Sequence, residues 1–314
     1  MLHSYNRKRG VAHRNQPNSK TILFSLCYLR LETKFLMRQT ISNQTFDEER
    51  ALYNLTDADV INCKFEGPQD GESVLKEARD ITVKDCSFSL RYPLWHVQNY
   101  RLADSTMDVN TRAAIWYAKG GNIENCTLDG IKCLRSIKGC TVHSPEFGWR
   151  CRGVSISQSF MESEYYLFES SDIEIDHLEM KGKYSFQYTN NLHIRDSILD
   201  TKDAFWHGKN ITVENSIVKG EYLAWFSDGL TLINCKIIGT QPLCYCKNLK
   251  LINCTMEGTD LAFEYSDVEA DIRGHILSVK NPRSGTITAD SVGEIIREGS
   301  IMDSQGKVIL RGEK

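Results

Sequence analysis

Apolar and polar residues alternate with a period of two in short segments along this chain, and these segments recur. Each recurring unit has two apolar residues separated by one residue, then two polar residues, a Cys or Ser, any residue and a further apolar residue. Examples are ITVKDCSF at 81–88, ITVENSIV at 211–218 and LTLINCKI at 230–237. Alternation over so few residues, with many β-branched side chains, predicts short strands rather than helices.

The unit occurs eleven times between Val60 and Leu251, and its spacing is regular in the second half of the chain. From Cys140 onward the step from one unit to the next is constant. A fixed period of about 19 residues indicates stacked copies of one small structural unit. The Cys/Ser slot is occupied in turn by Cys63, Cys86, Ser105, Cys126, Cys140, Ser159, Leu178, Ser197, Ser216, Cys235 and Cys254.

A unit of about 19 residues has room for three short strands joined by turns. If successive units stack in register, each strand pairs with its copy about 4.8 Å away, and the backbone polar groups are satisfied. The sequence therefore predicts an all-β fold, a parallel β-solenoid with eleven or so coils of about 19 residues and three short strands per coil.

The residue before the Cys/Ser slot is mostly Asn, Asp or Gly. These types tolerate left-handed backbone geometry in a tight turn, and stacked Asn side chains can bond one another along the column. In this respect the chain resembles the pectin-lyase-like right-handed parallel β-helices, whose coils carry an asparagine ladder, over roughly residues 50–270. The column reads Asn62, Asp85, Asp104, Asn125, Gly139, Gln158, His177, Asp196, Asn215, Asn234 and Asn253.

Two stretches, one before and one after the repeats, indicate a particular family within this superfamily. The opening QTISNQTF at 39–46 and the closing NPRSGTI at 281–287 are similar to an uncharacterised bacterial family of this superfamily, known only as a domain of unknown function. The resemblance implies the fold and brings no catalytic motif to this chain.

The limits of the pattern predict the domain organisation. Residues 1–36 are basic and lie outside the repeat, so we expect a disordered or spurious extension, with Met37 as the authentic start. We expect residues 37–58 to form an N-terminal cap, with a short helix or polar cap after Phe46, because an open stack needs a cover. The β-helix then spans 59–271. Residues 272–314 are expected to form irregular final coils and a C-terminal cap.

Composition narrows the classes of partner. A net charge of −3 at pH 7 gives no basic surface of the kind that attracts nucleic acid or anionic membranes. No apolar run approaches the roughly 18 residues of a membrane-spanning helix. We therefore expect no nucleic-acid partner and no membrane partner.

Six of the eleven cysteines occupy the repeating slot, where Ser or Leu replaces them in other coils. A small buried side chain behaves in this way, because a free Cys packs as a compact hydrophobe. Cys244 and Cys246 lie two apart, with no second pair at zinc spacing. The pattern predicts free structural thiols, no metal site and no cofactor, and it favours a reducing, cytoplasmic location.

All five tryptophans lie five residues before the first apolar position of a coil. The position after this column mixes aromatic, basic and acidic residues. Strand alternation predicts that the tryptophans point inward and the mixed column outward, whereas an irregularity in the strand would turn the tryptophans to solvent. The tryptophan column contains Trp95, Trp116, Trp149, Trp206 and Trp225.

Under either arrangement one outer face is rich in aromatic groups, and such faces mark interaction sites. Aromatic rings beside carboxylates suit sugars, which present apolar ring faces and hydroxyl edges. The resemblance also implies a polysaccharide groove on this part of the coil. We expect an oligosaccharide or polysaccharide ligand, and the candidate binding residues are Arg150, Glu169, Tyr188, Asp203, His207, Tyr222, Tyr245 and Glu264.

Two other functions stay open. A polysaccharide lyase or glycoside hydrolase would use Glu169, Asp203 and His207, because glycosidases need carboxyl groups on either side of the scissile bond. The near-constant period leaves little room for the long loops that flank such active sites in the superfamily. The second alternative is a rigid scaffold without ligand that self-associates through its aromatic face.

Overall fold

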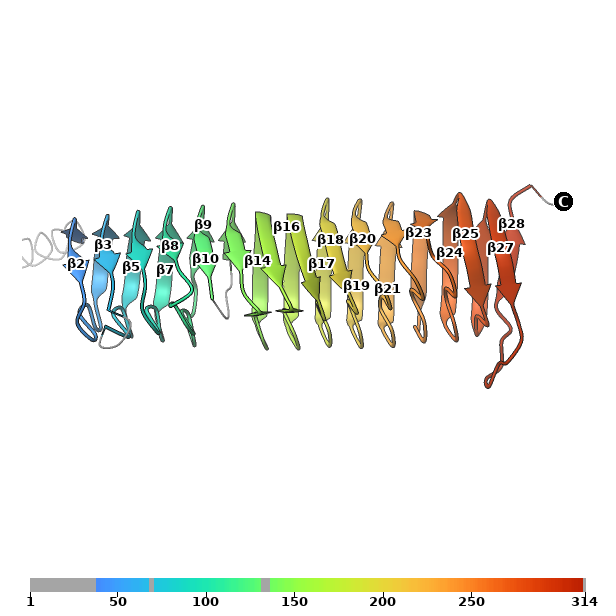
Figure 1. Cartoon of the computed structure of the whole chain (residues 1–314), viewed down its shortest axis with the longest axis horizontal. Coiled ribbons are helices and arrows are strands. Elements are labelled where there is room, and N and C mark those ends of the chain that lie inside the picture. Colours follow the sequence, from blue (N-terminus) through green and yellow to red (C-terminus); the bar gives the residue numbers. More distant parts are fainter. Residues whose placement is uncertain (1–37, 68–70, 131–135, 313–314) are drawn as a thin grey trace, which may run out of the picture. The chain divides into compact units, whose positions relative to one another are not determined.

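The computed structural model describes residues 38–67, 71–130 and 136–312. Thr40–Lys314 form one compact unit, in which short strands stack as successive coils in sequence order (Figure 1). The strands pair in parallel from coil to coil. The parallel β-helix is thereby confirmed, with about 14 coils rather than eleven. The extension predicted for 1–36 lies outside the described residues.

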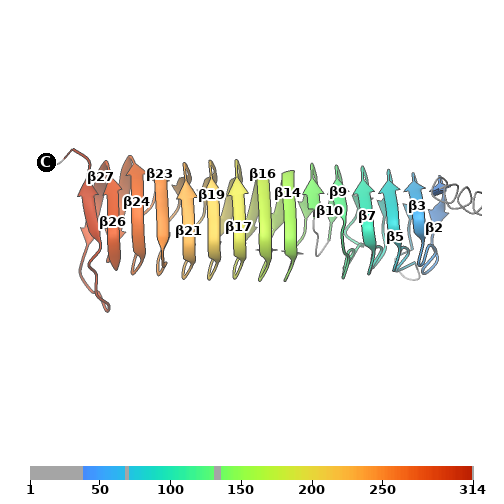
Figure 2. The same cartoon turned by 180° about the vertical axis from the view of Figure 1, so that it is seen from behind.

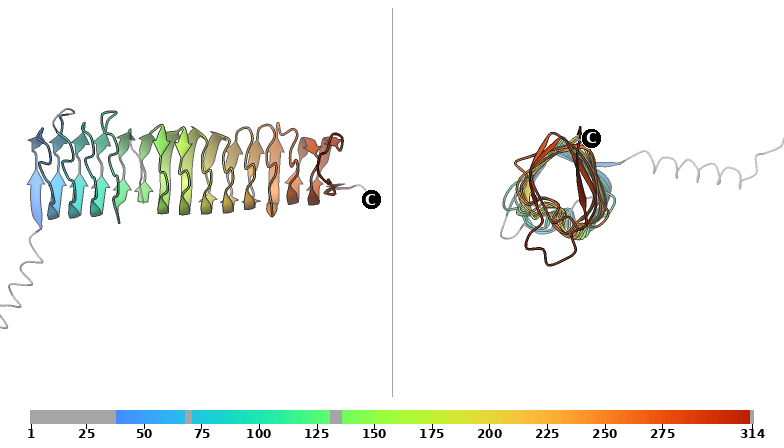
Figure 3. Two further views of the ribbon diagram at one scale, coloured as in Figure 1. Left: turned by 90° about the horizontal axis from the view of Figure 1, so that it is seen from below. Right: turned by 90° about the vertical axis from the view of Figure 1, so that its right-hand side faces the viewer.

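Two sides of each coil are built from strands. Seen along the axis, the coils superimpose as a ring (Figure 3). Side one, which faces the viewer in Figure 2, contains β1 (Gln39–Ser42), β3 (Thr56–Ile61), β5 (Arg79–Lys84), β7 (Gln98–Ala103), β9 (Asn122–Glu124), β11 (Ser136–Lys138), β14 (Arg152–Ser163), β16 (Ser171–Lys183), β17 (Asn190–Arg195), β19 (Lys209–Glu214), β21 (Asp228–Ile233), β23 (Leu249–Glu257), β24 (Asp267–Arg273), β26 (Ser284–Ala289) and β28 (Lys307–Leu310).

Side two follows each side-one strand after a corner of two residues, such as Asn215 and Ser216 between β19 and β20. Three long strands, β14, β16 and β23, continue around this corner without interruption. The remaining side-two strands are β2 (Thr45–Phe46), β4 (Lys64–Phe65), β6 (Ser87–Phe88), β8 (Thr106–Met107), β10 (Thr127–Asp129), β12 (Thr141–His143), β18 (Ile198–Lys202), β20 (Ile217–Lys219) and β22 (Lys236–Ile238). Within the described residues, no helix has the length and apolar character needed to cross a membrane.

Strand register confirms the repeat length. Ile137 lies opposite Ile156, and Ile156 lies opposite Ile175, so each step is 19 residues. Some steps are longer, since Val60 lies opposite Val83, 23 residues further along, and Leu102 lies opposite Ile123, 21 residues further along. One step is much shorter, because Ile123 lies opposite Ile137 and Thr127 lies opposite Thr141, only 14 residues further along. The missing five residues fall after side two, since the strands of sides one and two keep their register.

The core is a set of apolar columns parallel to the axis. The second apolar position of the repeat is fully buried in every coil from Val60 to Leu251, including Ile194 and Val213. Each of these side chains packs between its copies in the adjacent coils, which is why β-branched and leucine residues recur at a single position.

The Cys/Ser slot is buried as expected, but its role is more than packing. The Ser197 hydroxyl donates to the Arg195 carbonyl (2.7 Å) and accepts the backbone N–H of Leu178 in the previous coil (3.0 Å). The Cys86 thiol also donates to the Lys84 carbonyl (3.2 Å). A side chain here satisfies backbone groups at the corner, and this explains why Cys and Ser alternate where Ala would also fit.

Burial also lowers the reactivity of two core thiols. It raises the pKa of the Cys86 thiol to about 11, and it has the same effect on Cys246 elsewhere in the core, to about 11. Because the thiolate is the reactive form, these cysteines are structural, and the described cysteines are free thiols as predicted.

The left-handed corner is confirmed at every position of the predicted column, and side chains bond from rung to rung where asparagines recur. All eleven residues have positive φ, for example 51° at Asn62 and 52° at Asn253. Asn234 donates to Asn215 (3.1 Å) and accepts from Asn253 (2.9 Å) through side-chain amides. The ladder therefore offsets part of the conformational cost of the corner between sides one and two.

A second ladder, which the sequence analysis missed, occupies the corner before side one. Asn191 has φ 57°, and its side chain donates to Asp172 (3.0 Å). Asn99 and Asn248 make equivalent bonds to Asp80 and Asp228. The signal was present, because Asp, Asn or Gly also precedes the first apolar position of most coils.

Both ends of the β-helix are more regular than expected. The segment 37–58, expected as a cap with a short helix, contains β1 and β2, which pair with β3 and β4, and residues 48–54 form turns. Near the C-terminus, β25 (His275–Lys280) pairs with β27 (Ser291–Ile296), and β24, β26 and β28 pair in order. The segments called caps thus continue the coils.

Replacing Asn234 tests the ladder. Asn234→Gly removes two side-chain hydrogen bonds, at about 0.5–1.5 kcal/mol each, and leaves the left-handed backbone unstrained. Asn234→Ala loses the same bonds and adds roughly 1–2 kcal/mol of backbone strain. Urea unfolding should rank the free energy of unfolding as wild type, then Gly, then Ala. Equal values for Gly and Ala would contradict the strain.

Replacing Ile194 tests the core. Ile194→Asp buries an unpaired charge and should lower the free energy of unfolding by roughly 3–5 kcal/mol. Thr231→Asp, at an outward position of β21, is the matched control and should change it by less than about 0.5 kcal/mol. Similar losses in both variants would argue against the inward placement of the column.

Candidate functional site

The third side of each coil, between side two and the next side-one strand, was expected to be a strand and is mostly turn. In the coil around Phe186, residues Tyr184, Phe186 and Tyr188 have φ values of 52°, 59° and 57°. Residues in this left-handed region interrupt the alternation of an extended strand. In several coils two neighbouring side chains are buried and the next two reach the surface, as Leu223 and Ala224 are followed by Trp225 and Phe226. In the coil of Phe186 the next residue, Gln187, is buried as well, and Tyr188 is exposed.

The tryptophan column therefore faces solvent, and the prediction that it points inward was wrong. Trp116 and Trp149 are 39% and 44% exposed, whereas Leu94 and Phe186, each one residue before the column, are fully buried. The following column also points outward, with Tyr117 66% exposed. Both columns lie on one surface, and the reason is the turn geometry rather than any change in sequence pattern.

We define the aromatic face by the rings of these two columns. It contains Trp95, His96, Trp116, Tyr117, Trp149, Phe168, Tyr188, Trp206, His207, Trp225, Phe226 and Tyr245. Its rings contact one another from coil to coil.

Two tryptophans of the aromatic face are held by the backbone of the next coil. The indole N–H of Trp206 donates to the Tyr222 carbonyl (2.5 Å), and that of Trp225 donates to the Gln241 carbonyl (2.8 Å). Their rings are 5.4 Å apart and nearly parallel, at 3°. The indoles are thus positioned rigidly and stabilise the stack.

The second outward column forms a ring ladder. Tyr188 stacks on His207 (4.7 Å between centroids), His207 on Phe226 (5.0 Å) and Phe226 on Tyr245 (4.8 Å). The structure thereby brings three predicted binding residues, Tyr188, His207 and Tyr245, into one row. Because the ring faces cover one another, this row presents mainly ring edges to solvent.

Charged pairs lie at both ends of the ring ladder. Arg150 and Glu169 form an ion pair of 2.6 Å, and Lys280 lies 2.9 Å from Glu264. Burial, followed by the Glu264 carboxylate, raises the pKa of Tyr245 above its ordinary value. The predicted binding residues Arg150, Glu169 and Glu264 therefore flank the row and supply donors and acceptors there.

The remaining predicted binding residues, Asp203 and Tyr222, lie in a different column with Tyr184. Lys202 lies 5.1 Å from the Tyr222 ring, and Lys183 lies 4.4 Å from the Tyr184 ring. Asp203 is largely buried, and this desolvation raises the pKa of its carboxyl above the ordinary value.

The three candidate catalytic residues are not arranged as a catalytic pair. Tyr188 fills the position between Glu169 and His207 and stacks on the imidazole, so no ligand fits between them. Glu169 is ion-paired with Arg150, and Asp203 belongs to the other column. Among these described residues, the candidate carboxyl groups therefore do not lie on either side of one glycosidic bond, as a glycosidase requires.

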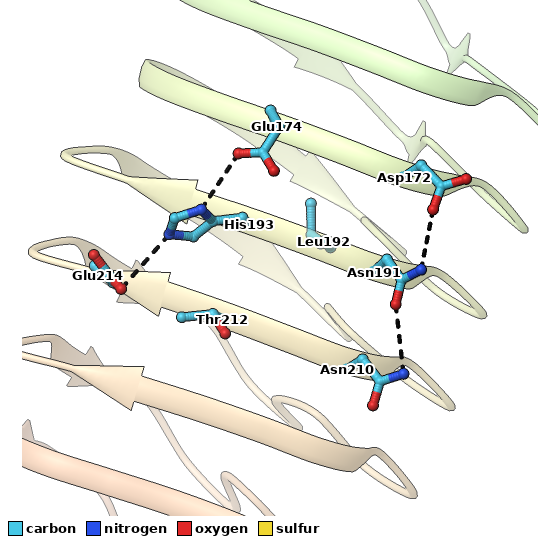
Figure 4. A pocket seen from close by; sticks show the side chains of 8 residues that line it. All are labelled: Asp172, Glu174, Asn191, Leu192, His193, Asn210, Thr212 and Glu214. Atoms are coloured by element: carbon cyan, nitrogen blue, oxygen red, sulfur yellow. Dashed lines mark hydrogen bonds and ion pairs between the residues drawn. The ribbon is translucent and has the colours of Figure 1, made fainter.

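A shallow pocket of about 600 Å³ lies on side one, across β16, β17 and β19 (Figure 4). His193 lies between two glutamates there, with Nδ1 3.3 Å from Glu174 and Nε2 3.6 Å from Glu214. The Asp172–Asn191–Asn210 part of the second ladder borders the same pocket. Because the imidazole fills the space between the two carboxylates, they cannot flank a sugar bond.

Comparison with known protein families gives one match that covers most of the chain. The model of a family described as a protein of unknown function, DUF3737, matches residues 39–310. The chain belongs to the DUF3737 family. This agrees with the uncharacterised family expected from the sequence. No curated protein matches this DUF3737 chain.

Solved structures with a similar course of the chain include two that act on polysaccharides. The periplasmic alginate epimerase AlgG covers 81% of this chain and 77% of its own, with 8% identity and a TM-score of 0.29. The catalytic domain of a GH87 α-1,3-glucanase in complex with nigerose covers 90% of this chain and 65% of its own, with 9% identity and a TM-score of 0.19. At TM-scores this low, neither structure bears on the site or activity of the DUF3737 chain.

The raised pKa of Asp203 predicts a pH-dependent gain in stability from Asp203→Asn. At pH 7 folding holds a poorly hydrated carboxylate, whereas below the ordinary pKa of 3.8 the group is protonated in both states and the cost is lost. We expect Asp203→Asn to raise the Tm by on the order of 2 °C at pH 7. The gain should shrink as the pH falls through the raised pKa toward 3.8.

The control for this prediction is Asp200→Asn, because Asp200 is an exposed partner of Lys219 (3.0 Å). It should give no gain at either pH. Scanning calorimetry at both pH values measures the effect, and a gain of Asp203→Asn that persists at pH 3 would contradict a desolvated carboxylate.

Proposed function

We propose that the DUF3737 chain is a carbohydrate-binding β-helix whose aromatic face binds an oligosaccharide along the solenoid axis. The observation that carries the proposal is the row of rings at the surface in successive coils, with exposed or half-buried tryptophans beside it in several of them. A long exposed aromatic strip on a protein surface usually marks an interaction site.

The chemistry of the face suits a sugar chain. Pyranose rings offer apolar C–H faces to aromatic groups and hydroxyl groups to charged side chains. Arg150 and Glu169 at one end of the ring ladder, and Glu264 and Lys280 at the other, supply such polar partners. The coil spacing of about 4.8 Å is close to the length of a pyranose unit, so successive sugars meet equivalent groups.

The exposed fractions of the rings favour one part of the face for stacking. Elsewhere each ring is covered by a ring in the next coil, as for His207 and Phe226. Tyr117 is 66% exposed, the highest value among the tryptophan, tyrosine and phenylalanine rings of the face. Trp116 lies beside it and is also exposed. We infer that a pyranose ring stacks on these two residues.

The geometry gives less support to the lyase or hydrolase alternative. The candidate acids are separated by Tyr188 or lie in another column, as described above. A binding function requires no such pair, and the row of rings and flanking charges is sufficient for it.

Replacing the two exposed rings tests the proposal. Trp116→Ala/Tyr117→Ala should weaken oligosaccharide binding by at least about tenfold, since exposed aromatic anchors dominate binding energy. It should leave the Tm nearly unchanged because neither ring is buried. Isothermal titration of wild type and variant against a panel of neutral and acidic oligosaccharides measures the effect.

The control is Ile252→Ala, which removes a similarly exposed apolar side chain from β23 and should bind as wild type. Failure of the wild-type protein to bind any member of the panel would overturn the proposed function. Unchanged binding by the double variant would place the site elsewhere on the β-helix.

A further inference from the structure

A separate group of polar side chains lies on the corner between sides one and two, away from the aromatic face. In four successive coils the ladder at this corner lacks asparagine and contains Gly139, Gln158, His177 and Asp196. His177 and Asp196 keep the left-handed geometry of a rung, with φ 54° and 51°. At these rungs the residue types differ from the asparagines of other coils, whereas the backbone geometry is the same.

His177 does not bond along the ladder as the asparagines do. Its Nδ1 lies 2.5 Å from Oδ1 of Asp176, the preceding residue on β16. The other carboxylate oxygen of Asp176 accepts a bond from the Arg195 guanidinium (3.4 Å). Arg195 thus orients the carboxylate and leaves Oδ1 directed at the imidazole.

Asp196 completes the group from the next coil. Adjacent rungs of the ladder lie about 4.8 Å apart, so the Asp196 carboxylate is placed beside the His177 ring. One ligand atom from each of Asp176, His177 and Asp196 lies within 4.8 Å of the other two. Among the described residues, this is the one group of three side chains of metal-binding type that meets this distance.

Open space adjoins two of the three side chains. A shallow hollow of about 430 Å³ is lined by His177 and Asp196, with Gln158 and Glu179 beside them. The hollow leaves space for solvent beside His177 and Asp196. The group therefore offers three protein ligands and at least one position for solvent.

The donor types select the kind of ion. Ca²⁺ and Mg²⁺ prefer oxygen ligands throughout, whereas an imidazole nitrogen with carboxylate oxygens suits Zn²⁺ and similar transition-metal ions. Zn²⁺ commonly has three protein ligands and one water in open sites. A carboxylate held by a guanidinium also fits, because such outer contacts orient metal ligands.

We propose that Asp176, His177 and Asp196 form a binding site for a divalent transition-metal ion of the Zn²⁺ class, with solvent from the adjoining hollow completing its coordination. This differs from the expectation of no metal site that composition suggested. The site is independent of the aromatic face and of the proposed function, because it lies on another corner of the coils.

Isothermal titration of chelator-treated protein with Zn²⁺ tests the site. Wild type should bind one equivalent. His177→Asn and Asp196→Asn should each weaken binding by at least about tenfold. Both changes introduce the residue that other rungs of the ladder carry, so the fold should be retained, as circular dichroism checks. Zn²⁺ should also raise the Tm of wild type and not that of His177→Asn, because binding to the folded state alone stabilises it.

Two controls locate the ion. Asp104→Asn changes an aspartate rung that accepts a bond from Asn125 (3.2 Å) and has no histidine beside it, and it should bind Zn²⁺ as wild type. His193→Asn removes the histidine between Glu174 and Glu214 and should also bind as wild type. Absence of Zn²⁺ binding by wild type, or unchanged binding by His177→Asn, would overturn the proposal, as would loss of binding on His193→Asn alone.

Discussion

Each coil turns two of its corners through a residue in the left-handed backbone region, and the rest of the β-helix depends on these corners. For a residue other than glycine this geometry costs roughly 1–2 kcal/mol. Asn215 and Asn234 offset the cost by bonding to each other along the column. Since each bond needs a partner in the adjacent coil, the corners stabilise one another, and register is maintained over many coils.

The same backbone geometry also builds the outer surface. On the third side, left-handed residues such as Phe205 and Ala224 are buried and leave the next two positions at the surface. This arrangement places tryptophans next to the row of Tyr188, His207 and Phe226. The aromatic face is thus a consequence of how the chain turns, and the indole bonds to the next coil make it rigid.

Most of the fold was predictable because it rests on a period that the sequence states directly. Every rung of the first ladder was identified from Asn, Asp and Gly, which signal left-handed turns. The third side was not, because Phe186 and Tyr188 adopt this geometry without such a signal. Counting positions along the repeat also predicted correctly that Tyr188, His207 and Tyr245 share one column. The same count left Glu169 and His207 as a candidate catalytic pair. The stacked ring of Tyr188 that separates them depends on side-chain packing, which the count does not describe.

For the Cys/Ser slot, the sequence predicted the burial of the side chain but not its hydrogen bonds. Small size predicted burial correctly, but the recurring bond from Ser197 to the backbone of two coils depends on its hydroxyl. The absence of Ala from the slot was the available signal. Leu178 interrupts this series, directly after His177 in the part of the ladder that lacks asparagine, so two departures from the repeat coincide.

The direction of the hydrogen bonds between coils has a mechanical consequence. They run along the axis, so a force that separates the two ends loads the interfaces between coils in series. Each interface carries the full load, and coils detach one after another from an end. Every detached coil of 19 residues releases about 65 Å of extended chain. In its regular half the β-helix therefore lengthens under force in equal increments.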